Sequence, residues 1–448
     1  MGDHYSAESF NSRSLGCDEW PFSKRSASLA AADDLARSTF HLRTVAIMLW
    51  AGFAKFGKVM ARQVPAFPLG GNGLGATSNR LPYVRRRAMK RIVICCDGTW
   101  NEPDHSEGGN PCPSNVVKLA SLVPATGQDG VAQRVFYHNG IGSMSSRTQR
   151  LIDGATGYGI SRILLTCYRW LVRVYQPGDE LFFFGFSRGA YTARSLAGYV
   201  RNSGILRPEN ESLIDEAFAL YRSRDGTRAP RAAASRLFRQ NYSWQDATDI
   251  QCIGVWDTVG SLGVPNTFAQ GVLKHLLRVN REFHDTDLSS IVRFAFHAIA
   301  IDERRKPFRA TLWTQTPEGL AAGQCLEQRW FPGTHSDIGG GNPDSSLSAL
   351  TLDWMIAGAR RAGLDVNDAS RLGPPNFPTH HPDALGPVFP SMTMLYQLFG
   401  PVDREICKSV GDGEALSDAA RERWASMPAW RPGALTDLKQ REPGALAP

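Results

Sequence analysis

The segment 181–200, LFFFGFSRGAYTARSLAGYV, constrains the fold of this chain more than any other stretch of the sequence. An uninterrupted apolar run leads into the pentapeptide GFSRG at 185–189, and small and apolar residues at helical spacing follow it. G-x-S-x-G between a strand and a helix is typical of a sharp turn that exposes its serine. Glycines suit the flanks of such a turn because a Cβ there would clash with the strand and helix. The segment therefore predicts a nucleophile elbow at Ser187.

Strand and helix patterns alternate from residue 89 onward. Apolar runs predict strands at 91–98, 134–142, 179–186, 249–260, 292–303 and 326–337. Apolar residues at helical spacing predict helices at 115–123, 161–175, 190–204, 212–224 and 346–364. This alternation predicts an α/β fold, similar to the α/β-hydrolases, with a mainly parallel sheet and helices on both faces. Ligands of such folds bind at the carboxyl ends of the strands, where several reactive side chains fall: Asp97, Ser187, Asp257, Asp302 and His335.

The two ends of the chain differ from this alternating part, which we expect to form a catalytic domain at 89–372. Residues 1–88 contain twelve Lys and Arg against six Asp and Glu, and predict a basic, poorly ordered extension. Within it, residues 40–63 have the pattern of a basic amphipathic helix that contacts a membrane or the main domain. A poorly ordered tail is the alternative, as is a natural start at Met89. Residues 373–448 begin Pro-rich and predict an appendage that packs on the core or caps it.

Composition excludes several classes of protein. The net charge of +7 comes mostly from residues 1–88, so we expect no nucleic-acid role for the main body. No apolar stretch reaches the roughly 18 residues of a transmembrane helix. The eight cysteines include no C-x-x-C pair, which argues against a disulfide framework or a zinc site and for synthesis in the cytoplasm. We expect neither a metal nor a cofactor, since the glycine-rich stretch at 154–161 has no nucleotide-binding pattern.

A serine nucleophile needs a base and a carboxylate that orients the base. Ser187, Asp257 and His335 follow the chain order of serine, acid and histidine found in α/β-hydrolases. His335 lies in a turn-rich loop directly after a predicted strand. Asp302 is the alternative acid because it also ends a strand, although the two arginines after Glu303 offer it ion-pair partners.

Other histidines and one more aspartate are weaker candidates. His297 falls inside an apolar run and is interpreted as a core or supporting histidine, and His380 and His381 lie in the irregular tail. Asp337 is close enough to the predicted base to shape its loop instead of taking part in chemistry.

Acyl transfer also needs donors for the oxyanion that forms on the substrate. The backbone N–H of Arg188, just after the serine, is one candidate. The loop CDGTWN at 96–101 supplies the other, through the N–H of Gly98 or Thr99, and Asp97 is expected to support this loop.

Six blocks, in order, resemble the conserved blocks of the uncharacterised α/β-hydrolase domain family numbered 2235: RIVICCDGTWN, GYGISRILLTCYRWL, PGDELFFFGFSRGAYTARSLAG, VWDTVGSLG, FHAIAIDERRKPF and RWFPGTHSDIGGG. The resemblance spans about 89–364, and the family includes phospholipase effectors delivered by bacterial type VI secretion systems. It implies an α/β-hydrolase fold and a Ser-Asp-His triad that falls on Ser187, Asp257 and His335.

The residues and the resemblance together predict a serine esterase or lipase that cleaves carboxylic esters of lipids through an acyl-enzyme. Phospholipase A activity is its most specific version, and delivery by a secretion system follows from the effector branch of the family. Two alternatives stay open, a soluble carboxylesterase acting on small esters and a non-catalytic binding module that keeps the hydrolase fold.

Overall fold

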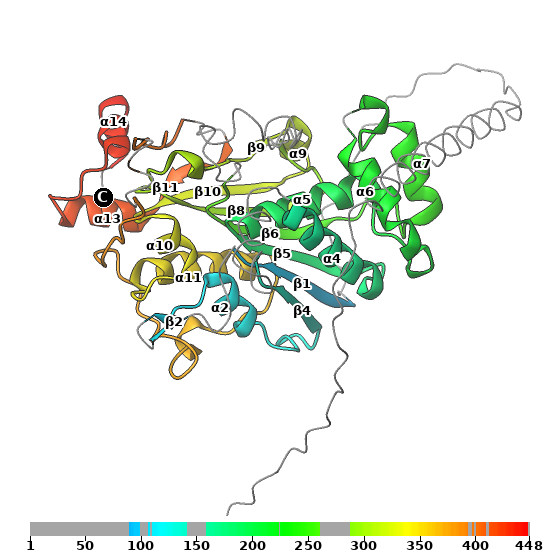
Figure 1. Ribbon diagram of the computed structural model, residues 1–448, viewed down its shortest axis with the longest axis horizontal. Coiled ribbons are helices and arrows are strands. Elements are labelled where there is room, and N and C mark those ends of the chain that lie inside the picture. The colour runs from blue at the N-terminus through cyan, green and yellow to red at the C-terminus, as the bar shows by residue number, and fades with distance from the viewer. Residues whose placement is uncertain are drawn as a thin grey trace, which may run out of the picture. The chain divides into compact units, whose positions relative to one another are not determined.

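The computed structural model describes residues 89–98, 106–107, 110–140, 158–223, 225–259, 287–392, 397, 400–408 and 412–446. Its main feature is a seven-stranded sheet with the order β11-β10-β8-β6-β5-β1-β4 (Figure 1). All neighbouring strands in this sheet run parallel. The strands are β1 Lys90–Cys96, β4 Ala132–His138, β5 Glu180–Phe186, β6 Ile250–Trp256, β8 Val292–Ala300, β10 Cys325–Phe331 and β11 Glu414–Leu416.

The central strands are buried on both faces. All residues of β5 and β6 are buried, as expected for parallel strands that helices cover on either side. Alternate side chains of β1 enter different hydrophobic clusters, because successive residues of a strand point to opposite faces. Ile92 and Ile94 join one cluster, whereas Val93 and Cys95 join the other.

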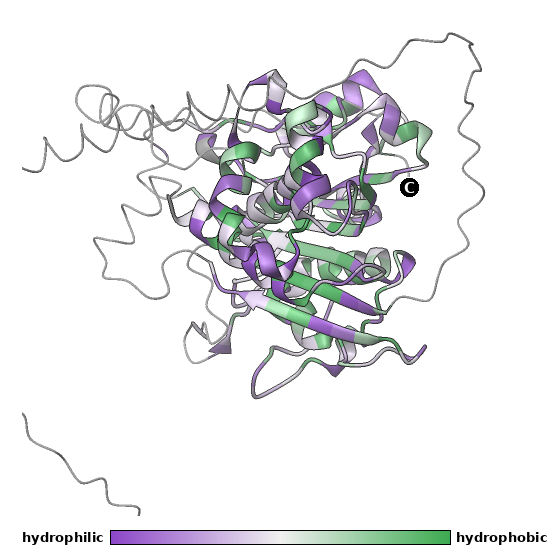
Figure 2. Ribbon diagram, turned by 90° about the vertical axis from the view of Figure 1, so that its right-hand side faces the viewer, coloured by the Kyte–Doolittle hydropathy of each residue, from purple (hydrophilic) through white to green (hydrophobic). Residues whose placement is uncertain are grey.

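Helices form a layer on each face of the sheet. The first cluster is completed by α4 Tyr158–Val174, α5 Arg188–Ser203 and α6 Ile214–Arg222, with α7 Ala233–Tyr242 against α5. The second cluster contains side chains of α2 Asn115–Leu122 and α11 Ser346–Arg361. In Figure 2, the strands are mostly hydrophobic, and the helices beside them carry both hydrophobic and hydrophilic residues. This arrangement confirms the predicted α/β-hydrolase-like fold with helices on both faces. Shorter elements are β2 Ser106–Glu107, β3 Asn110–Pro111, β7 Asp287–Leu288, β9 Thr314–Gln315, α9 Pro317–Ala321 and α10 His335–Gly339.

The C-terminal part of the chain contributes to the same sheet. Strand β11 pairs with β10 at the edge, and α13 Asp418–Ser426 and α14 Gly433–Arg441 follow it. Trp330, Ile406 and Leu435 lie in a third hydrophobic cluster, and the Trp330 indole N–H donates to the Glu414 carboxylate at 2.7 Å. Residues 373–448, which the sequence predicts as an appendage, thus supply a strand and part of the core.

The register of the sheet brings the carboxyl ends of its central strands together. Cys96 pairs with Gly185, Phe186 with Trp256, and Trp256 with Ala298. The residues that directly follow β1, β5 and β6 therefore leave the sheet at one edge, next to the segment after β8.

Candidate active site

Ser187 lies on the turn between β5 and α5, as the sequence predicts. Its backbone has φ 55° and ψ −120°, in a region that non-glycine residues rarely adopt. Both flanking glycines are needed for this turn. A Cβ at Gly185 would lie 2.4 Å from the Gly189 carbonyl oxygen, and a Cβ at Gly189 would lie 2.0 Å from the Cys96 carbonyl oxygen. Close packing of the helix start on β1 and β5 therefore holds Ser187 in its strained conformation.

Asp257 follows β6 on the neighbouring strand and is fully buried. Its φ of 39° is also positive, and only Ser187, Asp257 and Cys407 share this property among the non-glycine residues that the structure describes. Its backbone N–H donates to the Ala298 carbonyl at 2.8 Å, which fixes the turn. Such outliers persist where the surrounding structure enforces them, and they cluster at functional sites.

The Asp257 carboxylate faces His335. Asp257 Oδ2 lies 2.6 Å from His335 Nδ1. Burial by itself raises the pKa of a carboxyl, but the charge of Arg404 and the hydrogen bonds from His335 and Arg404 lower the pKa of Asp257 well below its usual range. Asp257 is therefore ionised, so Nδ1 carries the ring proton and donates it, and Nε2 is left as the basic nitrogen.

The position of His335 is fixed by the short helix α10, which it begins. Thr334 caps this helix, and the Asp337 carboxylate accepts the Thr334 N–H at 2.8 Å in a capping box. Burial raises the pKa of Asp337. Its hydrogen bond to Thr334 shapes the loop, in agreement with the sequence prediction. The imidazole ring of His335 packs against Phe186, at 4.7 Å between ring centroids, and against the edge of Phe308, at 5.0 Å.

Ser187 and His335 are linked through the residue that precedes the serine. Within the described residues, no hydrogen bond joins the Ser187 hydroxyl to His335. Phe186, the residue before the serine, carries the ring that contacts His335. Hydrogen bonds of this kind are often long or poorly aligned without substrate and shorten when substrate binds.

Asp302, the alternative acid, has a different set of partners. Its Oδ2 accepts the N–H of Gly333 at 2.7 Å, and its Oδ1 accepts the indole N–H of Trp430 at 3.0 Å. Burial raises its pKa. Asp302 thus holds the turn that leads to His335, while Asp257 contacts the imidazole itself.

The loop after β1 is supported by Asp97. This buried carboxylate accepts the Ser114 hydroxyl at 2.5 Å, the Tyr137 hydroxyl at 2.8 Å and the Gly98 N–H at 2.6 Å. The Gly98 N–H is therefore engaged by Asp97 in this structure. Thr99 lies outside the described residues. Arg188 is the first residue of α5, and the first N–H groups of an α-helix point toward its N-terminal end without an acceptor inside the helix, which keeps the Arg188 N–H a candidate oxyanion donor.

His297 supports the turn that follows β6. Burial, and secondarily the charge of Arg194, lowers its pKa to about 3, so the ring is neutral. Its Nε2 accepts the N–H of Thr258 at 3.1 Å, just after the buried acid. His380 pairs with Asp353 of α11 at 3.0 Å.

The sequence alone does not point to Arg404. Its guanidinium binds the Asp257 carboxylate through two nitrogens, with Nη1 2.6 Å from Oδ1 and Nη2 3.0 Å from Oδ2. It lies in the stretch PVDREI at 401–406, far along the chain in the irregular C-terminal part, where no local pattern marks a residue of the site.

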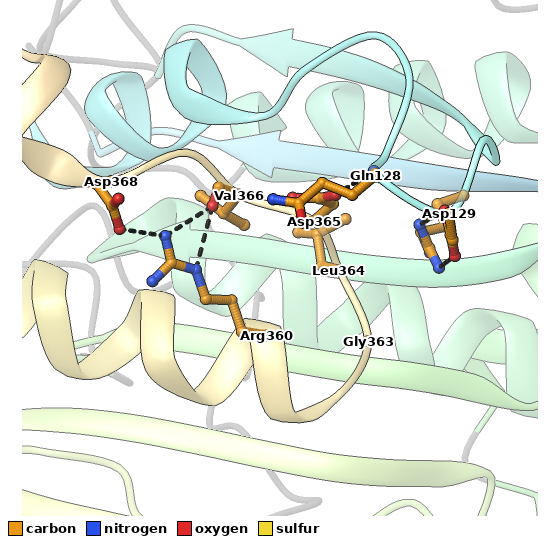
Figure 3. A pocket seen from close by; sticks show the side chains of 9 residues that line it. Gln128, Asp129, Arg360, Gly363, Leu364, Asp365, Val366 and Asp368 are labelled. Carbon is orange, nitrogen blue, oxygen red and sulfur yellow. Dashed lines mark hydrogen bonds and ion pairs between the residues drawn. The ribbon is translucent and has the colours of Figure 1, made fainter.

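A surface pocket of about 540 Å³ lies at the amino end of β1, and we call this end of the strands the amino edge of the sheet (Figure 3). Arg91, at the amino end of β1, and Arg360, near the end of α11, line it. Their charges are satisfied: Arg91 binds Asp129, and Arg360 binds Asp368 at 2.7 Å. None of Ser187, Asp257 and His335 lines this pocket.

Neither a metal-ligand cluster nor a membrane-spanning helix is found among the described residues. Over the described ranges, no group of three or more His, Cys, Asp and Glu residues is arranged to hold a metal ion. In the same part of the chain, no helix is long and apolar enough to cross a membrane. The stretch 40–63, predicted as an amphipathic helix, lies outside the described residues.

Comparisons with known proteins extend these observations. A relative from Saccharomyces cerevisiae, the uncharacterized protein YEL023C, is 28% identical over 265 residues, which are 55% of this chain and 36% of that protein. Among solved structures, an uncharacterized Pseudomonas aeruginosa protein aligns at 16% identity with a TM-score of 0.36, over 79% of this chain and 52% of that one. The esterase 2 of Thermogutta terrifontis, phosphoramylated by tabun, aligns at 12% identity with a TM-score of 0.31, over 63% of this chain and 86% of that one. The chain thus spans about a third of the yeast relative and about half of the Pseudomonas protein.

A family model identifies the chain more directly. The model for the type VI secretion system phospholipase effector Tle1-like catalytic domain matches residues 90–358. This span covers all six blocks on which the resemblance was based, and it includes β1 to β10 and most of the helix α11. The match extends over more than half of the chain, and the protein therefore belongs to the Tle1-like phospholipase effector family.

Proposed function

We propose that this protein is a serine hydrolase that cleaves carboxylic esters of lipids, and phospholipids in particular, through an acyl-enzyme. The observation that carries the proposal is the buried 2.6 Å contact between Asp257 Oδ2 and His335 Nδ1, beside the strained turn that bears Ser187. Membership of a family named for phospholipase effectors supports a lipid substrate and delivery through a secretion system.

In the acylation step, the Ser187 hydroxyl attacks the ester carbonyl and His335 Nε2 takes its proton. Asp257 stabilises the imidazolium that forms, and the Arg188 N–H donates to the oxyanion. The tetrahedral intermediate collapses as the carbon–oxygen bond to the alcohol breaks. His335 then donates its proton to the departing alcohol, which leaves an acyl group on the serine.

In the deacylation step, a water molecule replaces the alcohol. His335 Nε2 takes one proton from this water while the hydroxide attacks the acyl carbonyl. Collapse of the second intermediate releases the fatty acid and returns the proton to the serine oxygen. The sum is hydrolysis of one ester bond, with no cofactor consumed.

The test compares Ser187→Ala with the matched control Ser195→Ala, a buried serine on the helix α5 that follows Ser187. Hydrolysis is measured on phosphatidylethanolamine and phosphatidylglycerol vesicles and on monomeric short-chain esters. We expect Ser187→Ala to lose about 10⁶-fold in kcat while keeping the wild-type circular dichroism spectrum, and the control to stay active.

Other outcomes would change the proposal. A wild-type protein as inert as Ser187→Ala on every ester would contradict it and favour a binding module. Activity on short monomeric esters without activity on vesicles would favour the soluble carboxylesterase.

A further inference from the structure

We propose that Arg404 is a positioning residue for this reaction, which holds the Asp257 carboxylate in the orientation that presents Oδ2 to His335. The inference rests on the proposed function and assigns the C-terminal segment a part in the active site. Arg404 lies beyond residues 90–358, the span that the family model matches.

The contact has the geometry of a clamp. Each oxygen of the Asp257 carboxylate accepts two hydrogen bonds. Oδ1 accepts Arg404 Nη1 at 2.6 Å and the Ala300 N–H at 3.0 Å. Oδ2 accepts His335 Nδ1 at 2.6 Å and Arg404 Nη2 at 3.0 Å. Two parallel bonds from a planar guanidinium fix the plane of a carboxylate, which a single bond from an ammonium group does not do.

The arginine is itself held firmly in place. Only 4% of its side chain is exposed. Nη1 also donates to the Ala300 carbonyl at 2.9 Å, and Nη2 donates to the Phe308 carbonyl at 2.5 Å. The same guanidinium thus joins the end of β8, the loop that carries Phe308 against the imidazole, and the acid of the triad.

The backbone around Arg404 is anchored on both sides. Before it, the Val402 N–H donates to the Arg304 carbonyl at 2.9 Å. After it, Ile406 is buried in the cluster around Trp330. These contacts tie the segment to the ends of β8 and β10, so folding of the C-terminal part brings the guanidinium to Asp257.

Arg404 also changes the electrostatic environment of the His335 imidazole. Arg404 balances the charge of Asp257. Glu303, which accepts the backbone N–H of His335 at 3.4 Å, forms an ion pair with Arg305 at 2.8 Å. Asp337 lies on the helix of His335 itself. Loss of the Arg404 charge leaves the Asp257 charge uncompensated and stabilises the imidazolium.

Two substitutions separate geometry from charge. Arg404→Lys keeps the charge but loses the fork, and we expect a loss of about 100-fold in kcat with little change in KM, because small displacements of catalytic groups have effects of this size. Arg404→Met also removes the charge, and we expect the acidic limb of its profile of kcat/KM against pH to move to higher pH. The control is Arg423→Lys, at a buried arginine of the same C-terminal part that donates to the Ala384 and Gly386 carbonyls at 2.7 Å. It should keep wild-type kcat.

A spectroscopic measurement makes the test independent of turnover. The low-field NMR resonance of the His335 Nδ1 proton reports its hydrogen bond to Asp257, and it should shift or disappear in Arg404→Lys but not in Arg423→Lys. Wild-type kcat and an unshifted resonance in Arg404→Lys would overturn the inference, as would equal losses in both lysine variants. A wild-type protein that hydrolyses no ester would overturn the proposed function instead, while the resonance would still decide whether Arg404 positions the pair.

Discussion

Charged groups at the amino and carboxyl edges of the central sheet differ in burial and in the backbone strain around them. At the amino edge, Arg360 and Asp368 form an ion pair at the surface of an open pocket (Figure 3). At the carboxyl edge, Asp257 is fully buried beside His335. Positive φ angles at Ser187 and Asp257 add backbone strain there. A buried ion pair contributes little net stability compared with an apolar packing, so the buried pair at the strained edge is consistent with the proposed catalytic role.

The two carboxylates that follow β6 and β8 give the largest test of this difference. We expect Asp257→Asn to lower kcat by about 10⁴-fold, because an amide does not hold the imidazole in the proton-accepting tautomer. Asp302→Asn should lower kcat by only about tenfold, because it disturbs the loop at Gly333 and does not contact the imidazole. Asp129→Asn, at the amino edge, should leave kcat unchanged. Steady-state kinetics on one ester measures all three, and equal losses for the first two would remove the assignment of the acid.

Glycines at the two edges give the next largest effect. A Cβ at Gly189 meets the Cys96 backbone at 2.0 Å, whereas a Cβ at Gly127 meets the ends of the Arg91 and Asp129 side chains at 2.8 and 2.9 Å. We expect Gly189→Ala to lower the free energy of unfolding by about 3 kcal/mol or more, since the backbone cannot move aside. Gly127→Ala should change it by about 1 kcal/mol or less. Urea unfolding followed by fluorescence checks both values, and a reversed order would contradict this account of the turn.

The pH dependence of stability should carry opposite signs for the two carboxylates. The folded pKa of Asp257 is lowered, so its contribution is present above the unfolded value of about 3.9 and is lost as pH falls below it. The folded pKa of Asp302 is raised, so its contribution grows as pH falls. Between pH 6 and 3, we therefore expect a shallower loss of stability in Asp257→Asn than in wild type, and a steeper loss in Asp302→Asn. Unfolding midpoints across this range measure both slopes, and parallel curves would show that the two groups do not differ.

The smallest effect is expected at the amino edge. Arg360→Ala removes an exposed ion pair with Asp368 and two hydrogen bonds to the Val366 carbonyl, and exposed ion pairs contribute little to stability. The urea unfolding midpoint should fall only slightly, and ester hydrolysis should be unchanged. A clear loss of hydrolysis would show that the pocket at this edge is coupled to the site.

Much of this arrangement could be predicted from the sequence, because the signals are local. Ser187 sits between an apolar run and a helical pattern, and both glycines beside it are needed in the structure. Alternation of strands and helices indicated the parallel sheet, and the order of Ser187, Asp257 and His335 indicated which residues share an edge.

The rest depends on contacts between distant parts of the chain. Asp257 and Asp302 both follow apolar strands, and only the three-dimensional structure shows that one contacts His335 while the other contacts Gly333 and Trp430. Strand β11 has three residues, too few for an apolar pattern to be recognised. Arg404 lies 147 residues beyond its partner Asp257, so nothing in its local sequence indicates the contact.

The proposed reaction depends above all on Ser187 as the nucleophile that His335 activates. Labelling with a fluorophosphonate, followed by peptide mass spectrometry, tests it most directly, because the probe forms a covalent bond only with an activated serine. We expect one adduct, on Ser187, in the wild-type protein, and a strongly reduced labelling rate in a folded His335→Ala variant. No adduct, an adduct on a different serine, or equal rates in the two proteins would contradict the claim.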